Sequence, residues 1–300
     1  MSTSKWQVID AFGDAMAAAG LGQPKIIADG KLHRFRTADD KVGRQSGWYL
    51  LYLDRLPAGA FGSWKSGESR TWCAKSAEEQ TPAERADIRA LMDEARRRHQ
   101  SERDQRQRAA AMHALAIWNR CTPAPADHPY LVAKSIRPHG TRLDRYGNLV
   151  IPATDGETVT TLQFIAPDGG KRFLTGGRIV GCWFGIQSPK AGPILIGEGF
   201  ATMATLHLET GAPAVIAFNA TNLLPVAKAI RRMNLRKEIL ICGDDDRWTA
   251  GNPGRTKARA AALAIGGKLL MPDFTGMDVS SRPTDWNDWY RLRRLAREVA

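Results

Sequence analysis

Cysteine is scarce in this sequence, and the few cysteines lie far apart. Only four occur among 300 residues, and none forms a CxxC pair. Structural zinc sites and disulfide frameworks both need closely spaced cysteines, or cysteines paired with histidines. The sequence therefore predicts free thiols and no zinc, and it favours a reducing compartment such as the cytoplasm. The four cysteines are Cys73, Cys121, Cys182 and Cys242.

Long hydrophobic runs and a nucleotide-binding P-loop are also missing. No stretch approaches the roughly 20 apolar residues that cross a bilayer. The N-terminal segment carries Asp10 and Asp14 in place of the apolar core of a signal peptide. We therefore expect no membrane partner. The pattern G-x-x-x-x-G-K-S/T does not occur, which argues against an ATP-driven helicase region or an ABC-type ATPase.

Acidic residues are in the minority. Asp and Glu number 31 against 43 Lys and Arg, which gives a formal net charge of +12. Such an excess favours a polyanionic partner, because basic side chains displace the counterions condensed on phosphates. A charge that only keeps the protein soluble is the alternative. Hydrophobic residues make up 43% of the chain, as in an ordinary globular protein with one or two domains.

Residues 1–80 are predicted to form a small α+β module. A helix is expected from Ser4 to Ala19, followed by strands over 30–36 and 47–54. The segment 30–72 is dense in aromatic and basic residues, which nucleic-acid grooves use for base faces and phosphates. The alternative is that its rings only supply the core of the module. The candidates for binding single-stranded DNA are His33, Arg34, Arg36, Trp48 and Trp64.

The middle of the chain changes pattern twice. Residues 81–120 predict a long, mostly solvated connecting helix that begins with a capping Thr81, Pro82 and Glu84. Residues 121–190 alternate apolar and polar positions and predict an antiparallel α+β subdomain. Its expected strands are NLVIPA, TVTTLQFIAP, KRFLTGG and CWFGI, joined in part by Asp-Gly turns.

The last third has short apolar runs that alternate with amphipathic helical segments. The runs PILIG, AVIAF, EILIC and KLLMP fall within residues 191–274. This alternation predicts an α/β fold, with a parallel sheet covered by helices on both faces. Residues 275–300 contain an acidic segment, TDWNDW, and a final helix.

Carboxylates follow two of these predicted strands. Glu198 comes directly after PILIG, and Asp244, Asp245 and Asp246 come after EILIC. Ligands gather at the carboxyl ends of parallel strands. A bound cation would relieve the repulsion between such acids, and oxygen ligands favour Mg²⁺ or Mn²⁺. We predict a metal site from Glu198, Asp244 and Asp246 with Asp285 completing it, although Asp285 would also serve as a helix cap.

A basic helix start follows the acidic strand end. The helix that opens at Gly254 carries Arg255, Lys257 and Arg259 in its first turns. Free backbone N–H groups and cations at a helix start bind phosphates. We therefore predict a phosphate seat beside the metal, with Lys257 as a nucleotide-binding candidate.

This succession resembles the Toprim signature. A strand followed by GEG, a later strand followed by GDDD, and then a glycine-opened helix is its defining order. The Toprim domain is shared by DnaG-type primases, topoisomerases of types IA and II, OLD-family nucleases and recombination proteins of the RecR kind. The segment AFNATNL and the acidic TDWND are similar to segments of the primases in particular.

The region before the Toprim-like part is similar to the N-terminal half of the primase core. YLVAKSI resembles an element in which the family has an arginine where this chain has Lys134. The resemblance implies that Lys171 and Arg172 contact nucleotide or template, with Arg178 as a further candidate. It covers residues 128–290 and is nearest to primases of plasmids, phages and integrated elements. The zinc-binding domain of DnaG-type primases has no counterpart in the cysteine and histidine spacing.

The resemblance implies a DNA primase, a nucleotidyltransferase that builds short primers on single-stranded DNA with Mg²⁺ or Mn²⁺. Glu198, Asp244 and Asp246 would be catalytic. Nucleoside triphosphates and template would be bound, and a replicative helicase or other replication proteins would be partners. A Toprim nuclease that uses the same acids is one alternative. A DNA-binding replication factor without activity is another.

Overall fold

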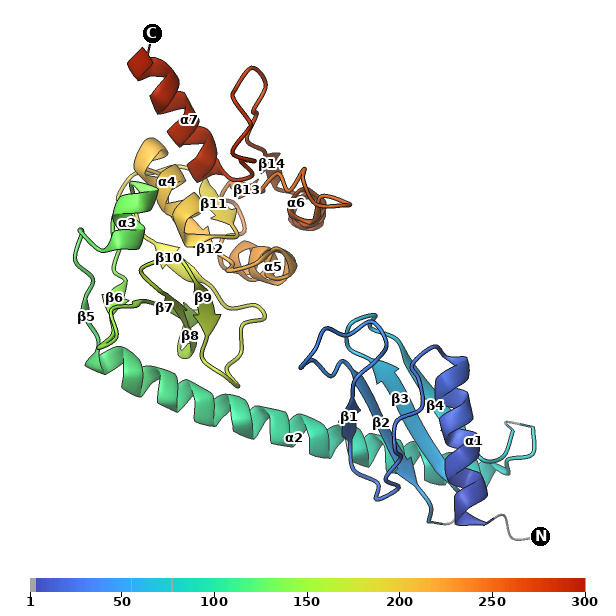
Figure 1. Ribbon diagram of the computed structural model, residues 1–300. Coiled ribbons are helices and arrows are strands. Elements are labelled where there is room, and N and C mark those ends of the chain that lie inside the picture. The colour runs from blue at the N-terminus through green and yellow to red at the C-terminus, as the bar shows by residue number, and fades with distance from the viewer. Residues whose placement is uncertain (1–3, 55, 77, 300) are drawn as a thin grey trace. The chain divides into compact units, whose positions relative to one another are not determined.

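Runs of alternating and of continuous apolar residues form separate sheets in the computed structural model (Figure 1). The structure describes residues 4–54, 56–76 and 78–299. These divide into two units, Met1–Asp104 and Gln105–Ala300, each with its own core. The boundary falls inside a long helix, whereas the five-part division expected from the sequence stays a prediction.

The first unit is an antiparallel sheet in the order β1-β2-β3-β4 with a helix on each face. Helix α1 starts at a capping box, in which Ser4 and Gln7 each accept a hydrogen bond from the other's backbone N–H. Because side chains alternate along a strand, Tyr49 and Leu51 face α1 while Leu50 faces α2. The elements are α1 (Lys5–Ala18), β1 (His33–Phe35), β2 (Gly47–Tyr52), β3 (Ala58–Ser63) and β4 (Ser69–Cys73).

The long helix α2 runs over Pro82–Arg120, within the range 81–120 in which the sequence predicts a helix. Thr81 and Glu84 form the expected cap. The N–H of Thr81 donates to the Glu84 carboxylate at 2.9 Å, and the N–H of Glu84 donates to the Thr81 hydroxyl at 3.2 Å. Met92 of its first half packs on the first unit, and Ala114 of its second half packs on the second. The arginines at 96–98 pair with Asp93 and Glu94 on a solvated face.

The second unit begins with an antiparallel sheet in the order β5-β6-β7-β8-β9. Its central pair β7 and β8 is buried on both faces, between α2 on one side and the larger core of the unit on the other. The elements are β5 (Thr122–Pro123), α3 (Pro129–Lys134), β6 (Arg142–Leu143), β7 (Leu149–Thr154), β8 (Val159–Ile165) and β9 (Lys171–Phe173).

A second sheet of this unit has the order β10-β12-β11-β13-β14, and β11 to β14 are parallel. This confirms the predicted α/β fold with a parallel sheet. The elements are β10 (Phe184–Ile186), β11 (Ile194–Gly197), α4 (Phe200–Thr210), β12 (Ala214–Ile216), η1 (Ala220–Asn222), α5 (Leu223–Met233), β13 (Ile239–Cys242), α6 (Pro253–Ile265), β14 (Lys268–Leu270) and α7 (Trp286–Val299).

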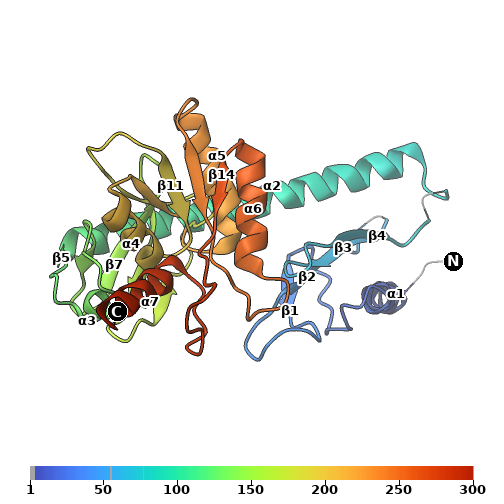
Figure 2. The same ribbon diagram turned by 90° about the horizontal axis from the view of Figure 1, so that it is seen from above.

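Helices cover both faces of the parallel sheet, as the apolar runs predict. Ile194 and Ile196 point to the face that packs against α5 and α6, which lie side by side in Figure 2. Leu195, between them in β11, points to the opposite core, where α4 and α7 meet. No described helix is both long and apolar enough to cross a membrane.

The segment CWFGI is not a strand of the antiparallel sheet, so that expectation is wrong. Phe184–Ile186 pairs antiparallel with Ala214–Ile216 at the edge of the parallel sheet. Trp183 forms an isolated bridge back to Thr154 of β7. An alternating pattern shows that a strand has one buried face but does not identify its neighbour, and here the buried face belongs to the second sheet.

Asn222 ties the segment between β9 and β10 to the end of β12. Its side chain is buried, and its Nδ2 atom donates to the carbonyls of Ile179, Cys182 and Ala217 at 2.8–3.1 Å. Its Oδ1 atom accepts from the N–H of Gly181 at 2.7 Å. An amide supplies both donors and acceptors, so asparagine satisfies this connection in a way that a carboxylate would not. Asn222 is the second asparagine of the segment AFNATNL, so these hydrogen bonds give that asparagine a structural role.

Replacing Asn222 by alanine should lower the free energy of unfolding by about 2–4 kcal/mol, because buried carbonyls lose their donors. Chemical denaturation of the full chain measures this loss. The exposed neighbouring variant Thr221→Ala serves as the control and should change stability by less than about 0.5 kcal/mol. Equal stability of Asn222→Ala and the wild type would contradict the assigned role.

Candidate active site at the carboxyl edge of the parallel sheet

Glu198 and Asp244 lie at the same edge of the parallel sheet. Strands β11 and β13 are neighbours, and their register pairs Gly197 with Cys242. The next residues along each strand are Glu198 and Gly243, so Asp244 lies one position beyond Glu198 on the adjacent strand. The sequence prediction that these two acids meet at strand ends is consistent with this register.

Asp285 and Asp246 are brought to this edge by backbone hydrogen bonds. The N–H of Asp245 donates to the carbonyl of Thr284 at 2.7 Å, which places Asp285 beside the end of β13. The Oδ1 atom of Asp285 also accepts from the N–H of Asp288 at 2.8 Å, so it caps α7 as well. Asp246 accepts from the N–H of Gly254 at 2.9 Å.

Gly254 makes the close approach of α6 to the acids possible. A Cβ atom at this position would lie 2.5 Å from the carbonyl oxygen of Asp244 and 2.9 Å from Oδ2 of Asp246. The first contact is with backbone, which cannot move aside cheaply. Glycine is therefore required where the helix begins.

The acids perturb one another's protonation. Burial first, and then the charges of Glu198, Asp285 and Asp246, raise the pKa of Asp244 well above its ordinary value. Burial and the charge of Asp246 raise the pKa of Glu198 to about 7. Burial and the charge of Asp288 raise the pKa of Asp285. These carboxylates therefore share one poorly hydrated site and repel one another when ionised.

Two lysines and a tyrosine border the acids. Partial desolvation lowers the pKa of Lys171. The charges of Asp285 and Asp244 oppose this shift, whereas the charge of Lys134 lowers the pKa further. The Lys171 ammonium lies 6.0 Å from the centre of the Tyr130 ring. The backbone of Lys134 is held in place because its carbonyl accepts a hydrogen bond of 2.7 Å from Asn287 of α7.

Tyr130 is a residue to which the sequence analysis gave no role. Its ring is buried, and its hydroxyl has no partner among the described residues. Burial and the charge of Asp285 raise its pKa. A buried hydroxyl without a partner is uncommon, and it is available to a bound ligand. The signal was present in the motif YLVAKSI, but a tyrosine in an amphipathic helix reads equally well as core.

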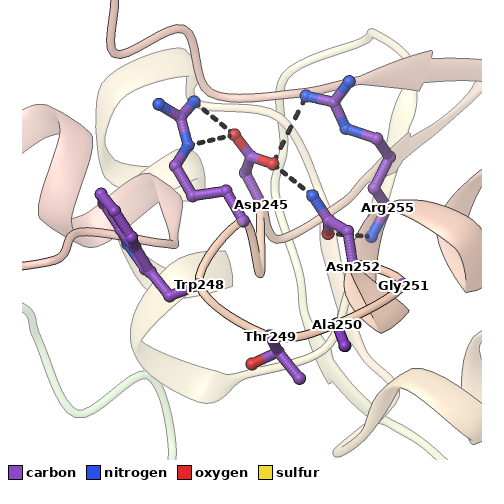
Figure 3. Close-up of a pocket in the computed structure, with 8 residues that line it drawn as sticks. Asp245, Trp248, Thr249, Ala250, Gly251, Asn252 and Arg255 are labelled. Atoms are coloured by element: carbon purple, nitrogen blue, oxygen red, sulfur yellow. Dashed lines mark hydrogen bonds and ion pairs between the residues drawn. The ribbon is translucent and has the colours of Figure 1, made fainter.

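The central acid of the GDDD run is already neutralised (Figure 3). Asp245 is buried and forms ion pairs with Arg247 and Arg255, while Asn252 donates to its Oδ1 atom at 2.6 Å. Burial alone would raise the pKa of Asp245, but these hydrogen bonds and charges outweigh it and lower the pKa. Asp245 thus orders the loop 245–255 rather than adding a charge to the site.

At the start of α6, where the sequence predicts a phosphate-binding site, the backbone N–H groups mostly donate to other groups of the protein. Pro253 has no N–H, the N–H of Gly254 donates to Asp246, and that of Arg255 donates to the Oδ1 atom of Asn252. Lys257 lies in the solvent-exposed part of α6. The backbone N–H groups of Gly254 and Arg255 are therefore not free to bind a phosphate.

Two other basic candidates point away from the acids. Arg172 follows Lys171 on β9 and so faces the other side of the sheet, with its guanidinium 4.3 Å above the ring of Phe164. Arg178 pairs with Asp155, and that carboxylate also accepts hydrogen bonds from the N–H groups of Thr158 and Glu157. Lys134 and Lys171 are the predicted basic residues that the fold brings to the acids.

The candidates of the first unit are divided between two faces. His33 stacks on Tyr49 and binds Asp29 at 2.8 Å, on the side of the sheet that faces α1. Arg34 pairs across the strands with Trp48 on the opposite side. Trp64 lies near both, and Arg36 is exposed after the end of β1.

The carboxylate oxygens at the acidic edge are of the kind that binds a hard divalent cation. Oε1 of Glu198 and Oδ1 of Asp244 are enclosed and have no hydrogen-bond partner among the described residues. Buried ionised oxygens need either a proton or a cation. The described residues contain no group of three or more His, Cys, Asp or Glu side chains already arranged to hold a metal ion. Glu198 and Asp244 are the residues at this edge whose unpaired oxygens suit such an ion.

Replacing Glu198 by glutamine should stabilise the metal-free protein at pH 8. A raised carboxyl pKa means that the folded state loses stability as pH rises from the unfolded value of 4.5 to about 7. We expect a gain of about 1–3 kcal/mol at pH 8 and a smaller gain at pH 5, because one pKa unit corresponds to about 1.4 kcal/mol.

Urea denaturation in the presence of a chelator measures this gain at both pH values. The exposed variant Glu157→Gln is the control and should change stability little at either pH. A Glu198→Gln protein that is no more stable than the wild type at pH 8 would rule out the inferred repulsion.

Comparison with known proteins places this site in a known domain. Residues 193–294 match the model of the Toprim domain. Two curated relatives, both named DNA primase TraC from Escherichia coli, are 37% identical over 280 residues and 38% identical over 283 residues. Each alignment covers 88% of this chain but only 26% and 19% of the relatives. The chain thus spans about a quarter or less of the proteins that it matches.

Two solved structures are also similar. The primase fragment of the bacteriophage T7 primase-helicase protein aligns with a TM-score of 0.41 at 16% identity, over 57% of this chain and 73% of that one. The T7 lagging-strand DNA polymerase complex with primase domains, an RNA/DNA hybrid and dTTP aligns with a TM-score of 0.40 at 17% identity, over 56% and 87%. By sequence, residues 193–294 match the Toprim domain, and over most of its length the chain is similar to proteins named DNA primase TraC.

Proposed function

We propose that this chain is the catalytic part of a DNA primase, which joins nucleotides into short primers on single-stranded DNA. The observation that carries the proposal is the acidic cluster at the carboxyl edge of the Toprim sheet, bordered by Lys134 and Lys171. A site that holds several carboxylates and two cations is suited to phosphoryl chemistry. The relatedness to TraC over 88% of the chain supports priming as the reaction.

Asp244, Asp246 and Glu198 would hold a divalent cation, with Asp285 at its margin. Mg²⁺ or Mn²⁺ suits these oxygen ligands better than zinc does. When bound, the cation would neutralise phosphate charge and lower the pKa of the primer hydroxyl. Asp246 keeps its orientation through the N–H of Gly254.

The reaction would form a bond between the primer 3′-oxygen and the α-phosphorus of the incoming nucleotide. The bond to the β-phosphate breaks, pyrophosphate leaves, and the hydroxyl proton is lost. Glu198 would either accept that proton as a general base or act as a ligand to the cation.

Lys171 and Lys134 would neutralise the triphosphate or the template strand. The Tyr130 hydroxyl, enclosed beside Lys171, would donate to a phosphate oxygen. Arg172, Arg178 and Lys257 lie outside this cluster and would contact the nucleic-acid strand.

The proposed partners follow from this reaction. They are single-stranded DNA, nucleoside triphosphates, and a replicative helicase or other replication proteins, in the cytoplasm. As the resemblance over residues 128–290 implies, the chain would serve a plasmid, phage or integrated element.

The test is primer synthesis by the full chain. We would supply single-stranded DNA, labelled ribonucleotides and deoxyribonucleotides, and Mg²⁺ or Mn²⁺. We expect short de novo products, and Asp244→Asn should reduce their rate by about 100-fold or more, because the transition-state charge loses a metal ligand. Glu157→Gln, a matched exposed variant, should retain the rate of the wild type.

Each outcome separates the proposal from its rivals. Cleaved DNA without new product would identify a nuclease that uses the same acids. Retention of DNA with neither activity would identify a binding factor. Primer synthesis that persists in Asp244→Asn would show that the reaction occurs elsewhere.

A further inference from the structure

The first unit carries an exposed aromatic and cationic surface that the acidic site does not use. Trp48 and Trp64 lie with ring centres 5.8 Å apart and planes tilted by 36°. The guanidinium of Arg34 lies 4.6 Å above the centre of the Trp64 ring. We call these three residues the stacking platform.

The strand register places the platform on one face of the sheet. Arg34 of β1 pairs with Trp48 of β2, which in turn pairs with Gly62 of β3. Glycine leaves room there, since a Cβ atom would lie 3.0 Å from the Trp48 ring and 2.1 Å from the carbonyl of Glu68. Trp64 follows two positions after Gly62, and its N–H donates to Ser46 at 3.0 Å.

Helix α2 covers only part of this face. Its residues Ile88 and Met92 pack with Leu50, Ala58 and Ala60. Trp48 borders that cluster and is half-buried, whereas Trp64 is 46% exposed. The Trp64 ring therefore stays accessible beside a cation, where it is able to stack on a planar ligand.

The loop beside the platform is held in place from within. Hydrogen bonds from the N–H groups of Ser46 and Thr37 lower the pKa of Asp40 to about 2. That carboxylate is turned inward, so it does not oppose an anion on the surface. Lys65 donates to the Asp39 carbonyl at 2.7 Å, and Arg36 donates to that of Asp40 at 3.3 Å.

Charge and shape together favour a nucleic acid as the occupant. Residues 30–72 contain eight Lys and Arg against four Asp and Glu, a local charge of +4. Rings that stack and a planar guanidinium suit unpaired bases, whose faces are hidden in a duplex. We infer that Arg34, Trp48 and Trp64 form a binding site for single-stranded nucleic acid, with Trp64 stacking on a base and Arg36 near a phosphate.

The proposed binding site contains fewer residues than the sequence indicated for the first unit. His33 is excluded, because it faces α1, stacks on Tyr49 and is paired with Asp29. The site lies within one unit and needs neither a metal nor nucleotides, so it does not depend on the proposed catalysis.

Fluorescence anisotropy of a labelled thymidine oligomer tests the inference with the full chain in the presence of a chelator. Trp64→Ala should weaken binding about 5- to 100-fold, because stacking of one base on an aromatic ring contributes about that much. Trp64→Phe should recover most of the affinity. The control is Trp6→Ala, which removes an exposed tryptophan of α1 and should leave the affinity unchanged.

A second variant separates charge from stacking. Arg34→Ala should weaken binding and reduce the salt dependence of log K by about 0.7 or less, whereas Arg34→Lys should keep the salt dependence but not the full affinity. The exposed control Glu157→Gln should bind the oligomer as the wild type does. Wild-type affinity in Trp64→Ala, or the same loss in Trp6→Ala, would overturn the inference. Equal effects of Trp64→Ala on duplex binding would overturn the preference for single strands.

Discussion

The second unit holds mutually repelling carboxylates at one edge of a buried sheet, and its other features accommodate them. Glu198 and Asp244 follow adjacent parallel strands, so the topology that buries the apolar runs also brings these charges together. Burial raises the pKa of Glu198 to about 7 and raises that of Asp244 well above its usual range. An arrangement of this kind costs stability unless a proton or a cation compensates it. We regard this cost as the mark of a functional site.

Neighbouring elements maintain the arrangement against that cost. The ion pairs of Asp245 with Arg247 and Arg255 order the loop after β13. Gly254 lets α6 approach the Asp244 carbonyl, and Asn222 ties the segment between β9 and β10 to the end of β12. None of these residues is expected to react, yet each fixes the position of a strand end or of an acid.

The sequence predicted the parallel sheet well, because continuous apolar runs bounded by helices have few other solutions. It also placed Glu198 and Asp244 at strand ends, which follows from chain order alone. It assigned CWFGI to the wrong sheet, because alternation does not identify a strand's partner. It placed a phosphate seat at α6, although the N–H groups of Gly254 and Arg255 are occupied by Asp246 and Asn252.

The direction of individual side chains was the other feature that the sequence did not predict. Neighbours on a strand point to opposite faces, so Lys171 borders the acids while Arg172 lies over Phe164. The same alternation separates His33 from Arg34 in the first unit. Tyr130 was missed because a hydroxyl without a partner is visible only after the surrounding chain has folded.

Binding of Mn²⁺ to the metal-free full chain tests the central claim most directly. Electron paramagnetic resonance of free Mn²⁺ gives the affinity for the wild type, Asp244→Asn and the exposed control Glu157→Gln. We predict that the wild type and the control bind Mn²⁺ alike, and that Asp244→Asn binds about tenfold more weakly or worse, because a ligand is lost. Equal binding by the wild type and Asp244→Asn would contradict the assignment of this buried acidic edge as a cation site.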